Sequence, residues 1–247
     1  MQNLNYGVIG NCSTAALISE KGAIEWLCFP EFDSPSVFAA ILDRQKGGHF
    51  GFKVTSDYKV TQSYVPHTNI LSTHFESEEG AFDVVDFMPC YPTSDGKDFY
   101  RPAEIYRYIR WAKGRPRMKV DYRPAPNYAR GKTIYNVTSQ YVETYSSVEN
   151  KDRQYLYSSL DLKKVVNHDE ITLEKDEFFL FSFNEKVIPV DIEREKLEYC
   201  RTLVYWLNWT DHAKRYTRYN EVIERSMLVL KLMTYRNGAV MAAVTTS

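Results

Sequence analysis

One loop concentrates the side chains that are best suited to hold a ligand. Between Trp26 and Phe38 the chain carries four aromatic residues, two prolines and the carboxylates of Glu31 and Asp33. Sugars are commonly held by aromatic faces and by hydrogen bonds to carboxylates, and loops often carry such sites. Trp26, Phe32 and Asp33 are therefore candidate substrate-binding residues. The alternative is that the aromatic residues belong to the core and that Asp33 belongs to the cap of a following helix.

The two carboxylates of this loop do not form a catalytic pair. An inverting glycosidase holds its acid and base on opposite sides of the substrate, about 6.5 to 9.5 Å apart. Glu31 and Asp33 are two residues apart in one loop, which does not suggest such an arrangement. Phosphate-loop and serine-hydrolase motifs are absent from the sequence, and Gly7 to Gly10 is only a fragment of a dinucleotide motif. The sequence therefore assigns no catalytic residue and no cofactor.

Histidine and cysteine spacing argues against a metal site. The five histidines include no pair at metal-ligand spacing, and the four cysteines include no C-x-x-C pair. We expect the cysteines to be buried free thiols. They are Cys12, Cys28, Cys90 and Cys200.

A basic stretch runs from Lys113 to Lys132, with seven basic residues, a single acid and interleaved aromatic residues. Such a pattern is typical of a platform for single-stranded nucleic acid. The solvated face of a strand and its turn is the favoured alternative, because Lys plus Arg is 31 against Asp plus Glu at 32 in the whole chain. We therefore expect no nucleic-acid partner.

Composition indicates a soluble globular chain of 247 residues, with 44% hydrophobic and 26% charged residues. Apolar runs are too short for a membrane span, and the N-terminus does not resemble a signal peptide. The sequence thus predicts a cytoplasmic protein without a membrane partner.

Alternating hydrophobic residues predict many short antiparallel strands in the first three quarters of the chain. A sandwich or barrel is the expected fold, because helices able to connect parallel strands are absent there. Three hairpins are expected, at Thr14–Ser19 with Ala23–Cys28, Asn69–Ser77 with Ala81–Phe87, and Glu104–Trp111 with Arg117–Arg123. Further strands are expected at His49–Thr55, Thr133–Val142, Gln154–Leu160, Glu170–Leu173 and Glu177–Asn184.

Helical patterns occur at three places. Ser36–Leu42 is predicted as a short helix, with Ser34 as its N-cap and Pro35 at its first position. After about residue 190 the period changes to 3.6, over Asp191–Asn208 and again over Arg218–Tyr235. The second of these helices is apolar around much of its circumference. One helix cannot form its own core, so we expect its packing partner to lie beyond residue 247 or on another chain.

Several segments resemble the N-terminal region of bacterial and archaeal glucoamylases and trehalases of glycoside hydrolase family 15. The resemblance is closest over residues 21–38, from Lys21-Gly22-Ala23-Ile24-Glu25-Trp26 to Pro35-Ser36-Val37-Phe38. Further matches are Gly47–Phe50, Phe82–Pro89, Arg225–Tyr235 and Gly238–Ser247. Glu25, Asn11 and Val244 depart from the residues usual in this family.

The resemblance implies a mainly β fold. Residues 1–190 would form an antiparallel β-supersandwich, 191–217 a helical linker, and 218–247 the first helix of a truncated (α/α)6 barrel. It also implies hydrolysis of α-glucosides with inversion, by two glutamates that lie downstream of Ser247. The chain would be a non-catalytic domain whose partners are its own downstream catalytic domain and, in the intact enzyme, an α-glucoside. Its Trp26 to Phe38 loop would reach the pocket rim. The alternative is a free-standing carbohydrate-binding β domain.

Overall fold

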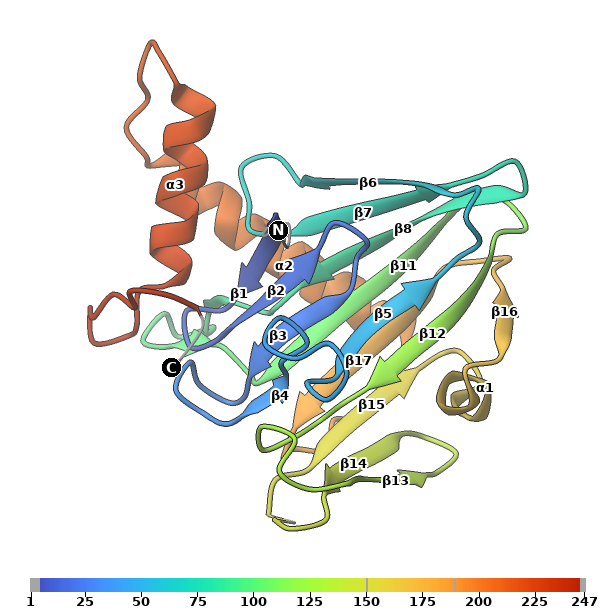
Figure 1. Cartoon of the computed structure of the whole chain (residues 1–247). Helices are drawn as coiled ribbons and strands as arrows, with labels where there is room; N and C mark the ends of the chain where they lie inside the picture. Colours follow the sequence, from blue (N-terminus) through green and yellow to red (C-terminus); the bar gives the residue numbers. More distant parts are fainter. Residues whose placement is uncertain (1–4, 150, 189, 245–247) are drawn as a thin grey trace.

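The computed structural model describes residues 5–149, 151–188 and 190–244, and it is built mainly from two antiparallel β-sheets (Figure 1). Within these residues the first sheet has seven strands, in the order β1-β2-β3-β5-β12-β16, with β4 paired to β3. Its strands are β1 (Tyr6–Gly10), β2 (Ala15–Ser19), β3 (Ile24–Cys28), β4 (Ser36–Phe38), β5 (His49–Lys53), β12 (Arg117–Arg123) and β16 (Glu170–Thr172). The expectation of a mainly β, antiparallel fold is confirmed.

The second sheet has eight strands within the same residues, in the order β13-β14-β15-β17-β11-β8-β7-β6. Its strands are β6 (Lys59–Tyr64), β7 (Leu71–Glu76), β8 (Gly80–Phe87), β11 (Glu104–Gly114), β13 (Thr133–Val137), β14 (Val142–Ser146), β15 (Gln154–Ser158) and β17 (Glu177–Phe183). The short strands β9 (Tyr91–Pro92) and β10 (Phe99–Tyr100) form a separate pair. The helices are α1 (Leu162–Asn167), α2 (Ile192–Asp211) and α3 (Asn220–Leu232).

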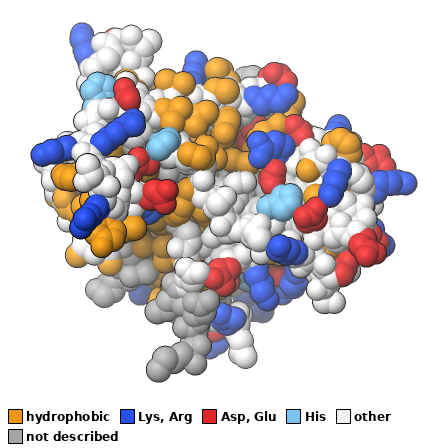
Figure 2. All heavy atoms as spheres, turned by 90° about the horizontal axis from the view of Figure 1, so that it is seen from above, with side chains coloured by type: hydrophobic (Ala, Val, Ile, Leu, Met, Phe, Trp, Pro, Cys, Tyr) orange, Lys and Arg blue, Asp and Glu red, His pale blue; other side chains and the backbone are white. Residues whose placement is uncertain are grey.

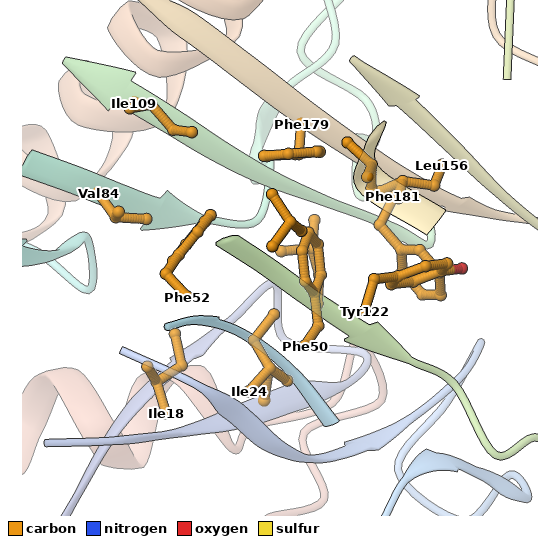
Figure 3. Close-up of a cluster of buried hydrophobic side chains, with 14 of the residues drawn as sticks. Ile18, Ile24, Phe50, Phe52, Val84, Ile109, Tyr122, Leu156, Phe179 and Phe181 are labelled. Carbon is orange, nitrogen blue, oxygen red and sulfur yellow. The ribbon is translucent and has the colours of Figure 1, made fainter. Parts of the chain in front are cut away.

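The main hydrophobic core lies between the two sheets. Side chains from both sheets point toward one another there, as Figure 3 shows for Phe50 and Tyr122 of the first sheet and Phe179 and Phe181 of the second. The rings of Phe50 and Phe179 meet edge to face, with centroids 5.4 Å apart. The aromatic-rich composition therefore forms the contact between the layers.

A second hydrophobic cluster lies on the other face of the eight-stranded sheet. Strand β17 reads Glu-Phe-Phe-Leu-Phe-Ser-Phe and is buried along its whole length. Phe179 and Phe181 belong to the core between the sheets, whereas Phe178 and Leu180 belong to the cluster that also holds Trp206 of α2. Because successive side chains of a strand point to opposite faces, an unbroken apolar strand needs cover on both. Helix α2 provides part of that cover.

Helix α3 is held against the β-sheets by its C-terminal half. Leu228 and Leu232 are buried, and Asn69 donates from Nδ2 to the carbonyl oxygen of Leu228 at 3.0 Å. Arg225 donates to the carbonyl oxygen of Thr68 at 2.8 Å. The face of α3 that carries Leu228 and Leu232 thus packs within the chain, and the expectation of a packing partner outside the chain is wrong for that face.

The opposite face of α3 is exposed. Val222 is 66% exposed and Leu230 is 57% exposed. For this exposed face, a packing partner outside the 247 residues stays a prediction. The domain boundaries predicted near residues 190 and 217 also stay predictions.

Two of the three predicted hairpins are confirmed, because β2 pairs with β3 and β7 pairs with β8. The third is wrong in its pairing. β11 pairs with β8 and β17, so both of its edges are occupied, whereas β12 pairs with β5 and β16 in the other sheet. The chain crosses between the sheets after Gly114, which has φ of 68° and lies against Glu79, so that a Cβ would meet the Glu79 carbonyl oxygen at 2.3 Å.

The short helix predicted at Ser36–Leu42 is also wrong. Residues 36–38 form strand β4, because Val37 and Phe38 place their side chains in the core between the sheets. Ser34 does not cap a helix, and its Oγ instead accepts a hydrogen bond from the Glu31 amide at 3.0 Å within a turn.

The single strand predicted over Thr133–Val142 is divided into β13 and β14 by a turn. The Thr138 hydroxyl accepts from the Gln140 and Tyr141 amides at 3.2 and 3.0 Å and thereby closes this turn. The remaining predicted strands are found as β5, β15, β16 and β17, within a few residues of the expected ends. Among the helices of the described residues, none is long and apolar enough to cross a lipid bilayer.

Candidate functional site

The aromatic residues of the Trp26 to Phe38 loop lie inside the protein. Trp26 in β3 is 0% exposed, and its Nε1 donates to the carbonyl oxygen of Val244 at 2.8 Å. Phe32 is 1% exposed and packs against Tyr235, with ring centroids 5.5 Å apart. Trp26 and Phe32 belong to separate hydrophobic clusters, so the structure does not bring them together. Their burial beneath the C-terminal segment favours the core interpretation for both.

Asp33 is the one predicted site residue with an exposed side chain. It lies in the turn that the Ser34 amide closes by donating to the Glu31 carbonyl oxygen at 3.1 Å. Burial raises the pKa of the nearby Tyr235, and the negative charges of Glu31 and Asp33 add to this shift. The tip of the turn therefore presents two carboxylates to solvent beside the C-terminal segment.

A groove lies where the β9–β10 pair meets α2 and α3. This groove has a volume of about 1410 Å³. Its walls are largely aromatic and apolar, and include Tyr91, Phe99, Tyr100, Val204 and Trp209. Seen from above, the molecule has an area where hydrophobic side chains gather, with charged side chains around it (Figure 2).

Polar side chains along the groove are bound to one another. The Tyr91 hydroxyl donates to Glu198 at 2.7 Å, and Arg201 donates to Glu198 and to the Tyr91 hydroxyl oxygen, both at 3.3 Å. Burial and the hydrogen bond to Glu198 raise the pKa of Tyr91. The sequence did not single out these residues, and the only signal was the charged and aromatic composition of residues 191–208.

The groove lacks a pair of carboxylates among its described lining residues. Among the described residues that line it, Glu198 is the only carboxylate, and its oxygens already accept from Tyr91 and Arg201. Glycoside hydrolysis usually needs two carboxylates on either side of the substrate. An aromatic and apolar groove of this size is suited to packing against another surface.

The basic stretch from Lys113 to Lys132 is partly neutralised by ion pairs with acids, of which Asp121 lies in the stretch itself and the others come from elsewhere in the chain. The ion pairs are Lys113 with Glu76, Arg115 with Glu174, Arg117 with Glu79 and Glu170, and Arg123 with Asp121. These contacts reduce the excess of positive charge that the sequence places there, which favours the interpretation as a solvated strand face.

Metal ligands do not gather in the part of the chain that the structure describes, where no group of three or more His, Cys, Asp or Glu side chains could hold an ion. All four cysteines lie in the described residues and are thiols, not disulfides. Cys12, Cys28 and Cys90 are buried as expected, whereas Cys200 on α2 is exposed, which corrects the expectation for that residue.

The fold thus defines a mainly β domain with α2 and α3 packed against the eight-stranded sheet and a groove that has one carboxylate among its described lining residues. Residues 5–150 match the family described as "Trehalase-like, N-terminal". Because the match covers more than half of the sequence, the chain belongs to this family of N-terminal domains of trehalase-like glycoside hydrolases.

Individual relatives agree with this assignment. The trehalase of Thermoplasma acidophilum is 29% identical over 240 residues, which cover 94% of this chain and 40% of that protein. The trehalase of Mycolicibacterium smegmatis is 27% identical over 98% of this chain and 40% of its own length. Trehalase 1 of Sulfolobus acidocaldarius is 51% identical over 85 residues, or 34% of this chain. The chain therefore spans about 40% of the length of the relatives that match nearly all of it.

Proposed function

We propose that this chain is the non-catalytic N-terminal part of an α-glucoside hydrolase of the trehalase or glucoamylase type. In this proposal the two sheets form the β-supersandwich, α2 is the linker helix, and α3 is the first helix of an (α/α)6 barrel. The observation that carries it is the unequal coverage, since relatives named trehalase match nearly the whole chain with only about 40% of their own length. The remaining length of such a protein would contain the catalytic domain.

The groove and the exposed face of α3 supply a surface for that domain. Val204 of α2 lines the groove and is 63% exposed, and Val222 and Leu230 of α3 are exposed as well. Large apolar side chains gathered on one surface are usually covered by a partner. In the intact enzyme the proposed cover is the helical domain that follows in the same polypeptide.

Val204→Arg tests this docking in the longer gene product. A charge placed in a buried contact costs several kcal/mol, so we expect trehalose hydrolysis to fall at least about tenfold. In the 247-residue chain the same change should leave the melting temperature almost unaltered, because the side chain is exposed there.

Val148→Arg is the matched control. Val148 is 66% exposed, lies between β14 and β15 in the chain and does not line the groove. Equal activities of the two variants would argue against a docking role for the groove.

The pocket-rim role is proposed for Asp33 alone, because Trp26 and Phe32 are buried. If Asp33 contacts the substrate in the intact enzyme, Asp33→Ala should lower kcat/KM by about 1 to 3 kcal/mol, which is roughly 5- to 150-fold. Its melting temperature should change little, because the side chain is exposed.

Ser34→Ala is the control for the turn itself. It removes the hydrogen bond from the Glu31 amide to Ser34 Oγ and should cost about 1 kcal/mol of stability without a kinetic effect. Unchanged kinetics in Asp33→Ala would remove Asp33 from the rim, while the docking proposal would stand on its own test.

A further inference from the structure

The strands at the ends of the two sheets differ in how well they are protected from pairing with another chain. In β1 the Val8 amide donates to the Tyr64 hydroxyl at 2.7 Å, and this hydroxyl donates to the Val8 carbonyl oxygen at 3.1 Å. Strand β16 has three residues and carries Glu170, and β6 begins with Lys59. Natural proteins use short strands and charged residues of this kind to keep sheet edges from joining.

Strand β13, at the other end of the eight-stranded sheet, has none of these features in its sequence. From residue 133 to residue 142 the chain contains no charged residue, no proline and no glycine. Ile134, Tyr135 and Val137 of β13 are 38%, 37% and 37% exposed. In Figure 1 this strand is the outermost one of its sheet, far from α3.

The backbone of β13 presents hydrogen-bonding groups to its open side. The Thr138 amide donates to the Tyr141 carbonyl oxygen at 3.0 Å, and the Ser147 amide donates to the Lys132 carbonyl oxygen at 2.9 Å. Such bonded positions alternate along an antiparallel pair, so residues 134 and 136 direct their backbone groups toward β14. The backbone groups of residues 133, 135 and 137 therefore point away from β14.

We propose that β13 pairs antiparallel with β13 of a second copy of this chain, with Tyr135 opposite Tyr135 on a two-fold axis. In this register Thr133 of each copy lies opposite Val137 of the other, so the outward backbone groups of both strands meet as hydrogen-bonded pairs. The two eight-stranded sheets then continue into one another. Because both copies use the same edge, the assembly closes at a dimer.

Charge and side-chain packing fit a second copy as the occupant. The paired segment is uncharged, so no like charges meet when it faces itself, and Lys132 lies opposite the uncharged Thr138 of the other copy. The Tyr135 ring already meets Tyr122 edge to face, with centroids 6.4 Å apart. The second copy's Tyr135 then covers the exposed part of this ring, and aromatic cross-strand pairs stabilise antiparallel strands.

The dimer surface is separate from the groove, because no residue of β13 is among the described residues that line the groove. The inference therefore does not rest on the proposed hydrolase function. Both surfaces can be occupied at the same time.

Sedimentation of the purified 247-residue chain at up to about 100 μM detects dimers of micromolar affinity. We expect twice the 28.8 kDa mass of one chain. Tyr135→Lys should raise the dissociation constant of the dimer at least about tenfold, because it places like charges opposite each other on the two-fold axis. Val204→Arg in the groove is the control and should leave the dimer unchanged.

Cysteine variants test the register, in a Cys200→Ser chain that lacks the exposed thiol. Tyr135→Cys places two thiols opposite each other with Cα atoms about 5.5 Å apart, a distance that suits a disulfide. Oxidised glutathione should join them in a covalent dimer and is itself reduced to two thiols. Val137→Cys is the matched control, since Val137 is equally exposed but its two copies are about 14 Å apart along the strands.

Three results would overturn the proposal. The first is a monomer at all these concentrations, and the second is a dimer that persists in Tyr135→Lys but dissociates in Val204→Arg. The third is cross-linking of Val137→Cys as complete as that of Tyr135→Cys.

Discussion

Asp86→Ala is expected to destabilise the chain by about 3 to 5 kcal/mol, the cost of leaving a buried charge without its partner. Asp86 and Arg107 face each other on β8 and β11, and both are 0% exposed. Arg107 donates from Nε to Asp86 at 2.7 Å, and its other nitrogens donate to the carbonyl oxygens of Phe50 and Gly22. Since Phe50 and Gly22 belong to the other layer, this arginine joins the two sheets.

Equilibrium unfolding in urea measures the effect. A double variant, Asp86→Leu with Arg107→Met, should recover most of the loss, because it leaves no unpaired charge in the core. Glu79→Gln is the surface control, since it alters an exposed ion pair with Arg117 and should leave the unfolding midpoint nearly unchanged. A small loss in Asp86→Ala, or a double variant less stable than either single one, would contradict this account.

Glu195→Gln is expected to stabilise the chain at neutral and alkaline pH. Glu195 on α2 is 1% exposed, and neither carboxyl oxygen has a hydrogen-bond partner among the described residues. Burial raises its pKa well above the ordinary value of 4.5, and the nearby charges of Asp86, Glu198 and Glu104 add to the shift. Folding therefore favours the protonated acid.

The sign of the pH dependence follows from this shift. The stability that depends on protonated Glu195 is fully present below about pH 4.5 and is lost as the pH rises toward the folded-state pKa. The loss approaches about 1.4 kcal/mol per pH unit in that range. Glutamine cannot ionise, so Glu195→Gln should be more stable than the wild-type chain at pH 8, and almost unchanged at pH 4.5.

Unfolding in urea at several pH values between 4.5 and 8 tests this expectation. Glu193→Gln is the control on the same helix, because Glu193 is exposed and should show no such pH trend. A parallel pH dependence of the wild-type chain and Glu195→Gln would mean that Glu195 is ionised or solvated in the folded state.

The strands could be predicted because alternation is a local property of the sequence. In β12, Met118, Val120 and Tyr122 are buried on one face, as the pattern indicated. The partner of a strand is not local, however. The turn before β12 resembles a hairpin, but the neighbouring edges of β11 are already occupied by β8 and β17, which lie elsewhere in the chain.

The candidate site was predicted less well, for a related reason. An aromatic residue in a loop has the same sequence pattern whether it contacts a ligand or the core. Trp26 and Phe32 are buried because Val244 and Tyr235, more than 200 residues away, lie against them. The groove is lined by the β9–β10 pair and by α2 and α3, which lie about 100 or more positions later in the sequence, so no local pattern could indicate it.

The central claim is tested most directly by glucose release from trehalose, measured for the purified 247-residue chain and for a longer protein that also contains the proposed catalytic domain. The account predicts no turnover by the chain alone, because Glu198 is the only carboxylate among the described residues that line its groove, and turnover by the longer protein. Turnover by the chain alone that disappears in Glu31→Gln or Asp33→Asn would contradict it, since the catalytic groups would then lie within these residues.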